Sequence, residues 1–197
     1  LIPETLLKFQ ELEGLFRHYL ELYGYKEIRT PVFEYTGVFA KENDTSDMVT
    51  KEMYTFSPNG KDSLTLRPEG TAGVIRSFVE NKMYGSNELP LKLGYIEEMF
   101  RHERPQKGRQ RQFTQMGVEA LGDKDPLLDA EVIALGYYYI KTIGLQGIKV
   151  LINTLGDSES RLAYKEELIH YFEPHKEELC TDCQNRLYKN PLRILDC

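Results

Sequence analysis

The residues best suited to chemistry lie on two stretches, 91–103 and 112–121, whose alternating side chains predict two long strands. Side chains two positions apart share one face of a strand, so Arg101 and Glu103 point together. The same rule groups Phe113, Gln115, Gly117 and Glu119. If the strands pair as a hairpin, one face presents a cation, a ring, an amide and two carboxylates around a vacant space at Gly117. We therefore predict a small polar pocket with one aromatic wall.

The stretch that joins these strands is strongly basic. Between Arg101 and Arg111 there are five Lys or Arg against Glu103 alone, a local charge of +4 in a chain whose net charge is −6. Such a loop favours polyphosphate or nucleic acid as a ligand. The alternative is a solvated hairpin held by cross-strand ion pairs, and periodicity alone does not separate the two.

A second polar cluster lies at 66–71, where a strand ends, Pro68 fixes the backbone and a helix begins. A carboxylate and a hydroxyl displayed there, from Glu69 and Thr71, can hold a substrate ammonium group. The alternative is that both side chains only cap the helix, because acidic groups are favoured at helix N-termini. Taken alone, the capping interpretation is the better one.

The cysteines form a third cluster. Cys180 and Cys183 have the spacing of metal or redox pairs, but a structural zinc needs four ligands. Only Cys197 and the histidines His170 and His175 are near in sequence. We therefore expect ordinary packing or exposed thiols and no metal site.

Composition bounds the class of protein. With 197 residues, 41% hydrophobic and 28% charged, the chain can bury a real core, which excludes disordered and collagen-like proteins. The net charge of −6 excludes a protein that coats nucleic acid through overall charge. No apolar run has the length of a membrane span, and an odd count of three cysteines favours a reducing compartment. We expect a soluble, cytoplasmic protein.

The elements that must position these residues follow from periodicity and turn signals. Apolar residues at helical spacing predict helices at 5–23, 71–84 and 129–143, and one from the N-cap Asp157 to Phe172. Extended segments are expected at 25–29, 32–33, 53–56, 63–66 and 148–153, in addition to the two long strands. A loop with room for a short helical turn is expected at 36–50, and irregular structure after Pro174. Long hairpin strands with segregated helices indicate an α+β fold, an antiparallel sheet flanked by helices.

These residues resemble the catalytic domain of class II aminoacyl-tRNA synthetases, and specifically of histidyl-tRNA synthetases. The stretch 24–33 with the helix before it resembles motif 1, the dimerisation element, and the segment from Phe100 through Arg109 to Phe113 resembles the ATP-binding motif 2. The stretches 65–71 and 112–119 are similar to the histidyl-specific versions, and 51–56 is also typical.

The resemblance implies a role for each site residue. Arg101 would hold the ATP α-phosphate as the catalytic arginine, Glu103 would meet the adenine amino group, Phe113 would stack on adenine and Arg109 would contact the γ-phosphate. Glu69 and Thr71 would bind the histidine ammonium, Gln115 the amino acid backbone and Glu119 the imidazole. The implied reaction forms histidyl-adenylate from histidine and ATP with Mg²⁺ and then transfers histidine to tRNA(His), in a homodimer.

The resemblance also implies a domain plan. Residues 1–156 correspond to the class II core with motifs 1 and 2, and 157–197 to the segment that leads toward the insertion domain. The later histidyl-specific segment, motif 3 and the anticodon-binding domain have no counterpart in these residues. We therefore expect a piece of a longer enzyme, nearly inactive alone. Two alternatives stay open: a non-catalytic histidyl-synthetase-like regulatory subunit of ATP phosphoribosyltransferase, against which the intact site residues argue, and a cysteine-based metal module.

Overall fold

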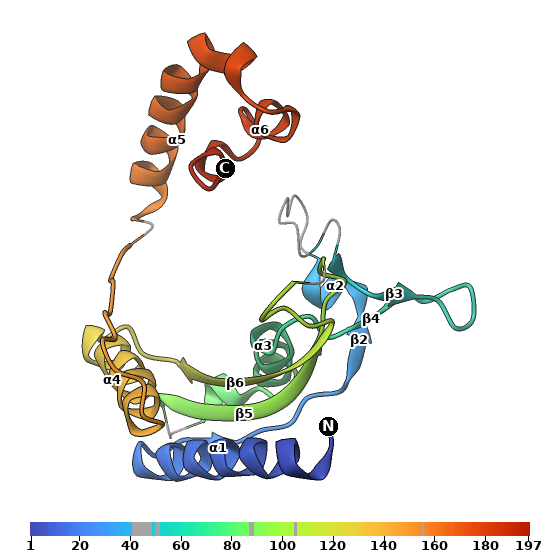
Figure 1. Cartoon of the computed structure of the whole chain (residues 1–197), viewed down its shortest axis with the longest axis vertical. Coiled ribbons are helices and arrows are strands. Elements are labelled where there is room, and N and C mark those ends of the chain that lie inside the picture. Colours follow the sequence, from blue (N-terminus) through green and yellow to red (C-terminus); the bar gives the residue numbers. More distant parts are fainter. Residues whose placement is uncertain (41–48, 50–51, 87–88, 105, 155) are drawn as a thin grey trace. The chain divides into compact units, whose positions relative to one another are not determined.

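The computed structural model describes residues 1–40, 49, 52–86, 89–104, 106–154 and 156–197 (Figure 1). The chain divides into two compact units, Leu1–Lys149 and Val150–Cys197. All residues predicted to bind ATP or histidine lie in the first unit. The expected loop at 36–50 falls largely outside the described residues, and its first residues form the short helix α2, Thr36–Phe39.

The first unit contains the predicted long hairpin. Strands β5, Leu91–Phe100, and β6, Gln112–Leu121, pair antiparallel along their whole length, and β1, Lys26–Glu27, adds a parallel strand beside β5. A second, antiparallel sheet has the order β2-β4-β3, with β2 at Phe33–Tyr35, β3 at Thr55–Phe56 and β4 at Leu64–Leu66. The α+β fold is confirmed, with a mixed sheet at its centre.

The hairpin ends earlier than the alternation predicts. Arg101 still donates its backbone N–H to the Arg111 carbonyl at 2.9 Å, but the N–H of His102 bonds to the Glu52 carbonyl at 2.7 Å instead. Strand β5 therefore stops at Phe100 rather than at Glu103, because a different segment takes over its hydrogen bonds.

One face of the hairpin carries helices α1, Pro3–Leu22, and α4, Pro126–Thr142. Their core consists of Phe16, Leu20, Tyr25 and Leu135. Helix α1 lies so close to β5 that a Cβ atom on Gly94 would come within 2.4 Å of the Leu20 side chain, so the position requires glycine. Helix α4 starts earlier than expected, because Asp125 caps it by accepting the Leu127 N–H at 2.9 Å.

The other face carries helix α3, Thr71–Glu80, and Figure 1 shows α1 and α3 on opposite sides of the hairpin. The core on this side consists of Val74, Leu93, Tyr95 and Met99. The helix predicted at 71–84 is interrupted, because Lys82 adopts a left-handed backbone with φ of 52°, after which the 3₁₀ turn η2 covers Met83–Gly85. Packing of Val74 in this core places the start of α3 against the hairpin.

The prediction of a strand at 148–153 is wrong. Residues 148–154 form neither a helix nor a strand, and Leu151 and Ile152 are 91% and 78% exposed. An apolar stretch forms a strand only where a partner strand supplies hydrogen bonds, and no described strand pairs with this segment.

The second unit begins with helix α5, Ser158–Phe172, whose predicted cap is confirmed by the bond from the Ser160 N–H to Asp157 at 2.7 Å. The region after Pro174, expected to be irregular, holds three short helices: η3, Glu173–Glu178; α6, Thr181–Arg186; and η4, Pro191–Ile194. A small core of Cys183, Leu187 and Ile194 explains α6 and η4, because Cys183 lies in α6, Leu187 directly follows it and Ile194 ends η4, whereas η3 has no buried residue. Among the described helices of the chain, none is both long and apolar enough to cross a membrane.

Candidate active site

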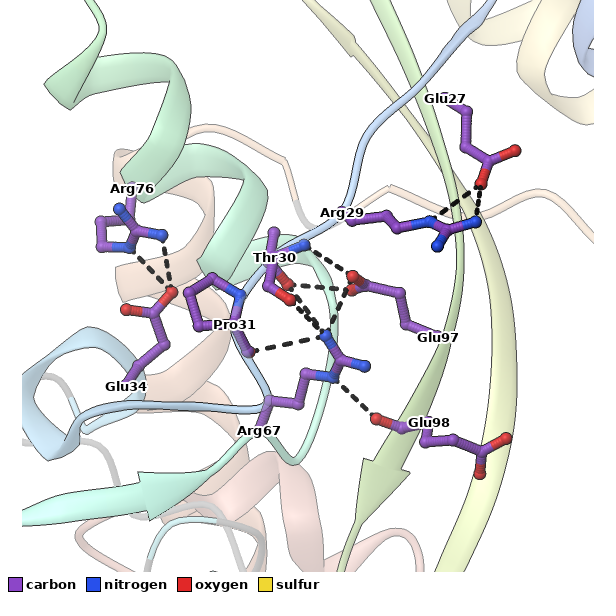
Figure 2. Close-up of polar contacts among 9 residues, drawn as sticks. All are labelled: Glu27, Arg29, Thr30, Pro31, Glu34, Arg67, Arg76, Glu97 and Glu98. Atoms are coloured by element: carbon purple, nitrogen blue, oxygen red, sulfur yellow. Dashed lines mark hydrogen bonds and ion pairs between the residues drawn. The ribbon is translucent and has the colours of Figure 1, made fainter.

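A buried ion pair fixes the loop that leads into α3 (Figure 2). The Arg67 guanidinium lies 2.9 Å from the Glu97 carboxylate and donates to the backbone carbonyls of Glu98 and Thr30, both at 2.7 Å. Glu97 in turn accepts the N–H of Thr30 at 2.6 Å and its hydroxyl at 2.9 Å. A buried pair persists only when its remaining hydrogen bonds are satisfied, as they are here. The network ties β4 and the segment around Thr30 to β5.

Sequence reasoning assigned Glu97 no role. The register of the hairpin could have pointed to Glu97. It lies directly opposite Gln115, a predicted site residue, and therefore on the same face of the sheet.

The predicted space at Gly117 is filled by a tyrosine ring. Tyr95 lies opposite Gly117 in the ladder, and Cβ atoms placed on Gly117 or Gly70 would each approach the Tyr95 ring to 2.3 Å. The prediction of a vacant space is therefore wrong, and both glycines instead admit the ring. Burial raises the pKa of Tyr95 to about 12, with the Glu119 carboxylate adding to the shift, so the phenol stays neutral.

Beside this ring, β6 and α3 meet through one hydrogen bond. The hydroxyl of Thr71 donates to the Glu119 carboxylate at 2.7 Å. Burial raises the Glu119 pKa, Glu69 raises it further, and the Thr71 bond opposes both. The arrangement concentrates negative charge at a half-buried position, which favours a cationic or N–H-rich ligand.

The two residues at the start of α3 divide between the alternative roles. Glu69 accepts the Ala72 N–H at 2.8 Å and thereby caps the helix, as the structural interpretation predicted. Thr71 instead bonds to Glu119, so its hydroxyl is directed to β6. Gln115 lies on the same face of β6 as Glu119, four residues away along the strand. The four predicted histidine-binding residues thus come from adjacent elements.

The predicted catalytic arginine lies over an aromatic ring. The Arg101 guanidinium carbon is 5.2 Å from the centre of the Phe113 ring, within the range of a cation–π contact. Its Nε donates to the Pro68 carbonyl at 2.7 Å, which holds the side chain at the loop before α3.

Glu103 is bracketed by the two predicted phosphate ligands. Its carboxylate lies 3.1 Å from Arg109 Nη1 and 3.9 Å from Arg101 Nη1. The Oε2 atom is buried and, among the described residues, receives no hydrogen bond of good geometry. Arg109 is more than half exposed, so this acceptor is only loosely engaged.

A cavity of about 650 Å³ opens at this end of the hairpin. Its lining includes all four residues predicted to bind ATP: Arg101, Glu103, Arg109 and Phe113. Glu98, Gln110, Gln112 and Thr114 contribute the remaining polar wall, and the Thr114 hydroxyl donates to Glu98 at 2.8 Å. The structure thus groups the predicted site residues into two clusters on adjoining parts of the first unit.

Comparison with known proteins agrees with this geometry. The sequence profile of the family described as histidyl-tRNA synthetase matches residues 1–159. Histidine–tRNA ligases of Listeria monocytogenes and Anoxybacillus flavithermus are 58% and 57% identical over the whole chain, which covers 47% of each. The crystal structure of apo S. aureus histidyl-tRNA synthetase superposes with a TM-score of 0.76 at 44% identity, over 98% of this chain and 45% of that one.

The chain spans about half the length of the curated relatives it matches. Within that span, the profile match and the identity cover the hairpin, the start of α3 and both site clusters. The chain belongs to the histidyl-tRNA synthetase family.

Proposed function

We propose that the protein activates histidine with ATP and transfers it to tRNA(His). One observation carries the proposal: the Thr71–Glu119 cluster and the Arg101–Phe113 stack lie on the same hairpin, joined through Gln115 and Gly117 of β6. An acidic pocket beside an arginine-lined cavity suits a reaction between an amino acid and a nucleotide.

The acidic pocket fits histidine. We assign the imidazole to Glu119, whose carboxylate accepts a ring N–H that other small amino acids lack. Glu69 and Thr71 would bind the ammonium group, and Gln115 the backbone. The Tyr95 ring, which packs against Gly70 and Gly117, would limit the size of the side chain that binds beside Glu119.

The cavity fits ATP. Adenine would displace the Arg101 guanidinium from the Phe113 face, and its amino group would donate to Glu103 Oε2, which lies 3.1 Å from Arg109 Nη1 without a hydrogen bond of good geometry. Arg101 would then bind the α-phosphate and Arg109 the γ-phosphate. Mg²⁺ would enter with the triphosphate and neutralise part of its charge, and we assign no described residue to it.

The chemistry is an in-line displacement. A histidine carboxylate oxygen attacks the α-phosphorus, a new P–O bond forms, and the bond to the β-phosphate oxygen breaks to release pyrophosphate. Both reactants are anionic, so the protein's part is to hold them together and to stabilise negative charge at the α-phosphoryl group. The positive charge that stabilises the α-phosphoryl group would come from Arg101.

The remaining assignments concern partners and domains. Leu6, Leu7 and Leu22 of α1 are 40%, 61% and 66% exposed, an apolar surface that supports a homodimer through this helix. The basic loop 104–111 supports contact with tRNA, whose charging would take place in the cytoplasm.

We propose residues 1–156 as the catalytic core and 157–197 as the start of an inserted segment. The profile match over 1–159 supports this division.

The regulatory alternative has weaker support. A Bacillus halodurans structure titled ATP phosphoribosyltransferase regulatory subunit/histidyl-tRNA synthetase has a TM-score of 0.67 but 24% identity, a likeness of fold alone.

Pyrophosphate exchange tests the proposal. The polypeptide that contains these residues should incorporate labelled pyrophosphate into ATP with histidine and not with the other amino acids. Exchange that is absent, or that is equal with asparagine or glutamine, would contradict it.

A further inference from the structure

The cysteines of the chain converge in the second unit. The Sγ atoms of Cys180, Cys183 and Cys197 all lie within 4.8 Å of one another, and those of Cys180 and Cys197 are 3.8 Å apart. Cys180 and Cys183 flank the start of α6, whereas Cys197 arrives after η4. Sequence spacing supplied one pair, and the fold brings the third thiol to it.

These separations suit one metal ion. A tetrahedral zinc site with Zn–S bonds of about 2.3 Å has sulfur–sulfur edges of about 3.8 Å. The Cys180–Cys197 separation of 3.8 Å already has that length. The other two edges lie below 4.8 Å and need to shorten by about 1 Å at most, which small side-chain rotations supply.

Burial fixes how the ion would be held. Cys183 is 1% exposed and lies in the core with Leu187 and Ile194, whereas Cys180 and Cys197 are exposed. One thiolate would therefore support the ion from the core and two would flank it at the surface. The fourth coordination position then faces outward.

Packing explains only one of the three thiols. Cys183 fills the core, but two exposed thiols beside it bury nothing. The helices they connect are short, six residues for α6 and four for η4, and the buried core of this cluster has three members. A small, weakly packed segment of this kind gains most from a metal cross-link.

We propose that Cys180, Cys183 and Cys197 bind one zinc ion as three thiolates, with water or a side chain from another segment as the fourth ligand. The thiol protons pass to solvent on binding. Thiolate ligands select zinc over magnesium or calcium. This replaces the expectation of no metal site and does not depend on the proposed synthetase activity.

Metal analysis tests the site directly. The protein should be purified in reductant, without chelators or a metal-affinity tag. Inductively coupled plasma mass spectrometry should then find about one zinc ion per chain. Cys180→Ser and Cys197→Ser should lose most of it on dialysis against a competing chelator. Both residues are exposed, so these changes leave the core intact. Thr181→Ala, which changes one of the two residues between Cys180 and Cys183, should keep the metal.

Cobalt substitution supplies a second readout. Cobalt(II) bound by thiolates gives charge-transfer absorption that should decrease in each serine variant. Wild-type protein with no zinc, no such absorption and three alkylatable thiols would overturn the proposal, and so would serine variants that keep the metal. A Cys180–Cys197 disulfide, seen as a loss of two hydrogens that reduction restores, would also overturn it. Neither readout uses activity, so failure here leaves the proposed function untouched.

Discussion

Replacing Glu119 by glutamine removes one charge and keeps the shape of the side chain. The amide oxygen still accepts the Thr71 hydroxyl, which now lies 2.7 Å from the carboxylate. What is lost is the charged hydrogen bond to the imidazole, worth about 1.5 to 3 kcal/mol. We expect histidine to bind about 10- to 150-fold more weakly and ATP to bind nearly as before.

Stability gives this prediction an internal check. Burial raises the Glu119 pKa, so the folded state holds its proton to higher pH than the unfolded chain. The ionised carboxylate therefore lowers the free energy of unfolding once the pH rises through that window. Glu119→Gln should melt no lower than wild type at pH 7, and the difference should vanish in acid. Histidine binding to wild type should likewise weaken as the pH falls, starting above the ordinary range of a glutamate.

Isothermal titration with histidine and with ATP, together with thermal melts, measures all three quantities. Glu80→Gln is the matched control, because Glu80 lies on α3 in an exposed pair with Arg76 and should change none of them. Equal loss of histidine and ATP binding, or a lower melting temperature in Glu119→Gln, would refute the reasoning.

Four further predictions follow from single contacts. Gly117→Ala, whose Cβ would meet Tyr95, should reduce the free energy of unfolding by about 1 to 3 kcal/mol in denaturant titrations, whereas Gly14→Ala in α1 meets no atom within 4 Å and should not. Arg67→Ala strands the buried Glu97 and should cost about 3 to 5 kcal/mol by the same assay. In the longer polypeptide that contains these residues, Arg101→Ala should slow pyrophosphate exchange by about 10²- to 10³-fold, while Arg104→Ala, in the exposed loop, leaves it unchanged. Leu7→Glu should convert a dimer to monomers in sedimentation, since Leu7 is 61% exposed on α1.

The sequence was informative where chemistry and periodicity coincide. The β5–β6 hairpin, the Asp157 cap and the shared face of Arg101 and Phe113 were all predicted from spacing. The resemblance named the residues that the structure groups into a cluster around Glu119 and the lining of one cavity. Their individual roles stay predictions.

What the sequence missed depends on contacts between distant segments. Tyr95 fills the space at Gly117 because hairpin register places it there, and the strand ends at Phe100 because Glu52 takes the next hydrogen bond. The segment 148–153 is apolar enough for a strand but has no described partner, and the cysteine cluster needs the turn of η4 to form. Local patterns carry no information on such partners.

The central claim is that the acidic pocket and the arginine-lined cavity form one site for histidyl-adenylate. A non-hydrolysable analogue, histidyl-sulfamoyl-adenosine, contains both halves, and its dissociation constant tests the claim by titration calorimetry. The account predicts binding at least about 100-fold tighter than that of histidine or ATP, weakened by both Glu119→Gln and Arg101→Ala. An analogue that binds no tighter than ATP, or an alanyl analogue that binds equally well, would contradict it.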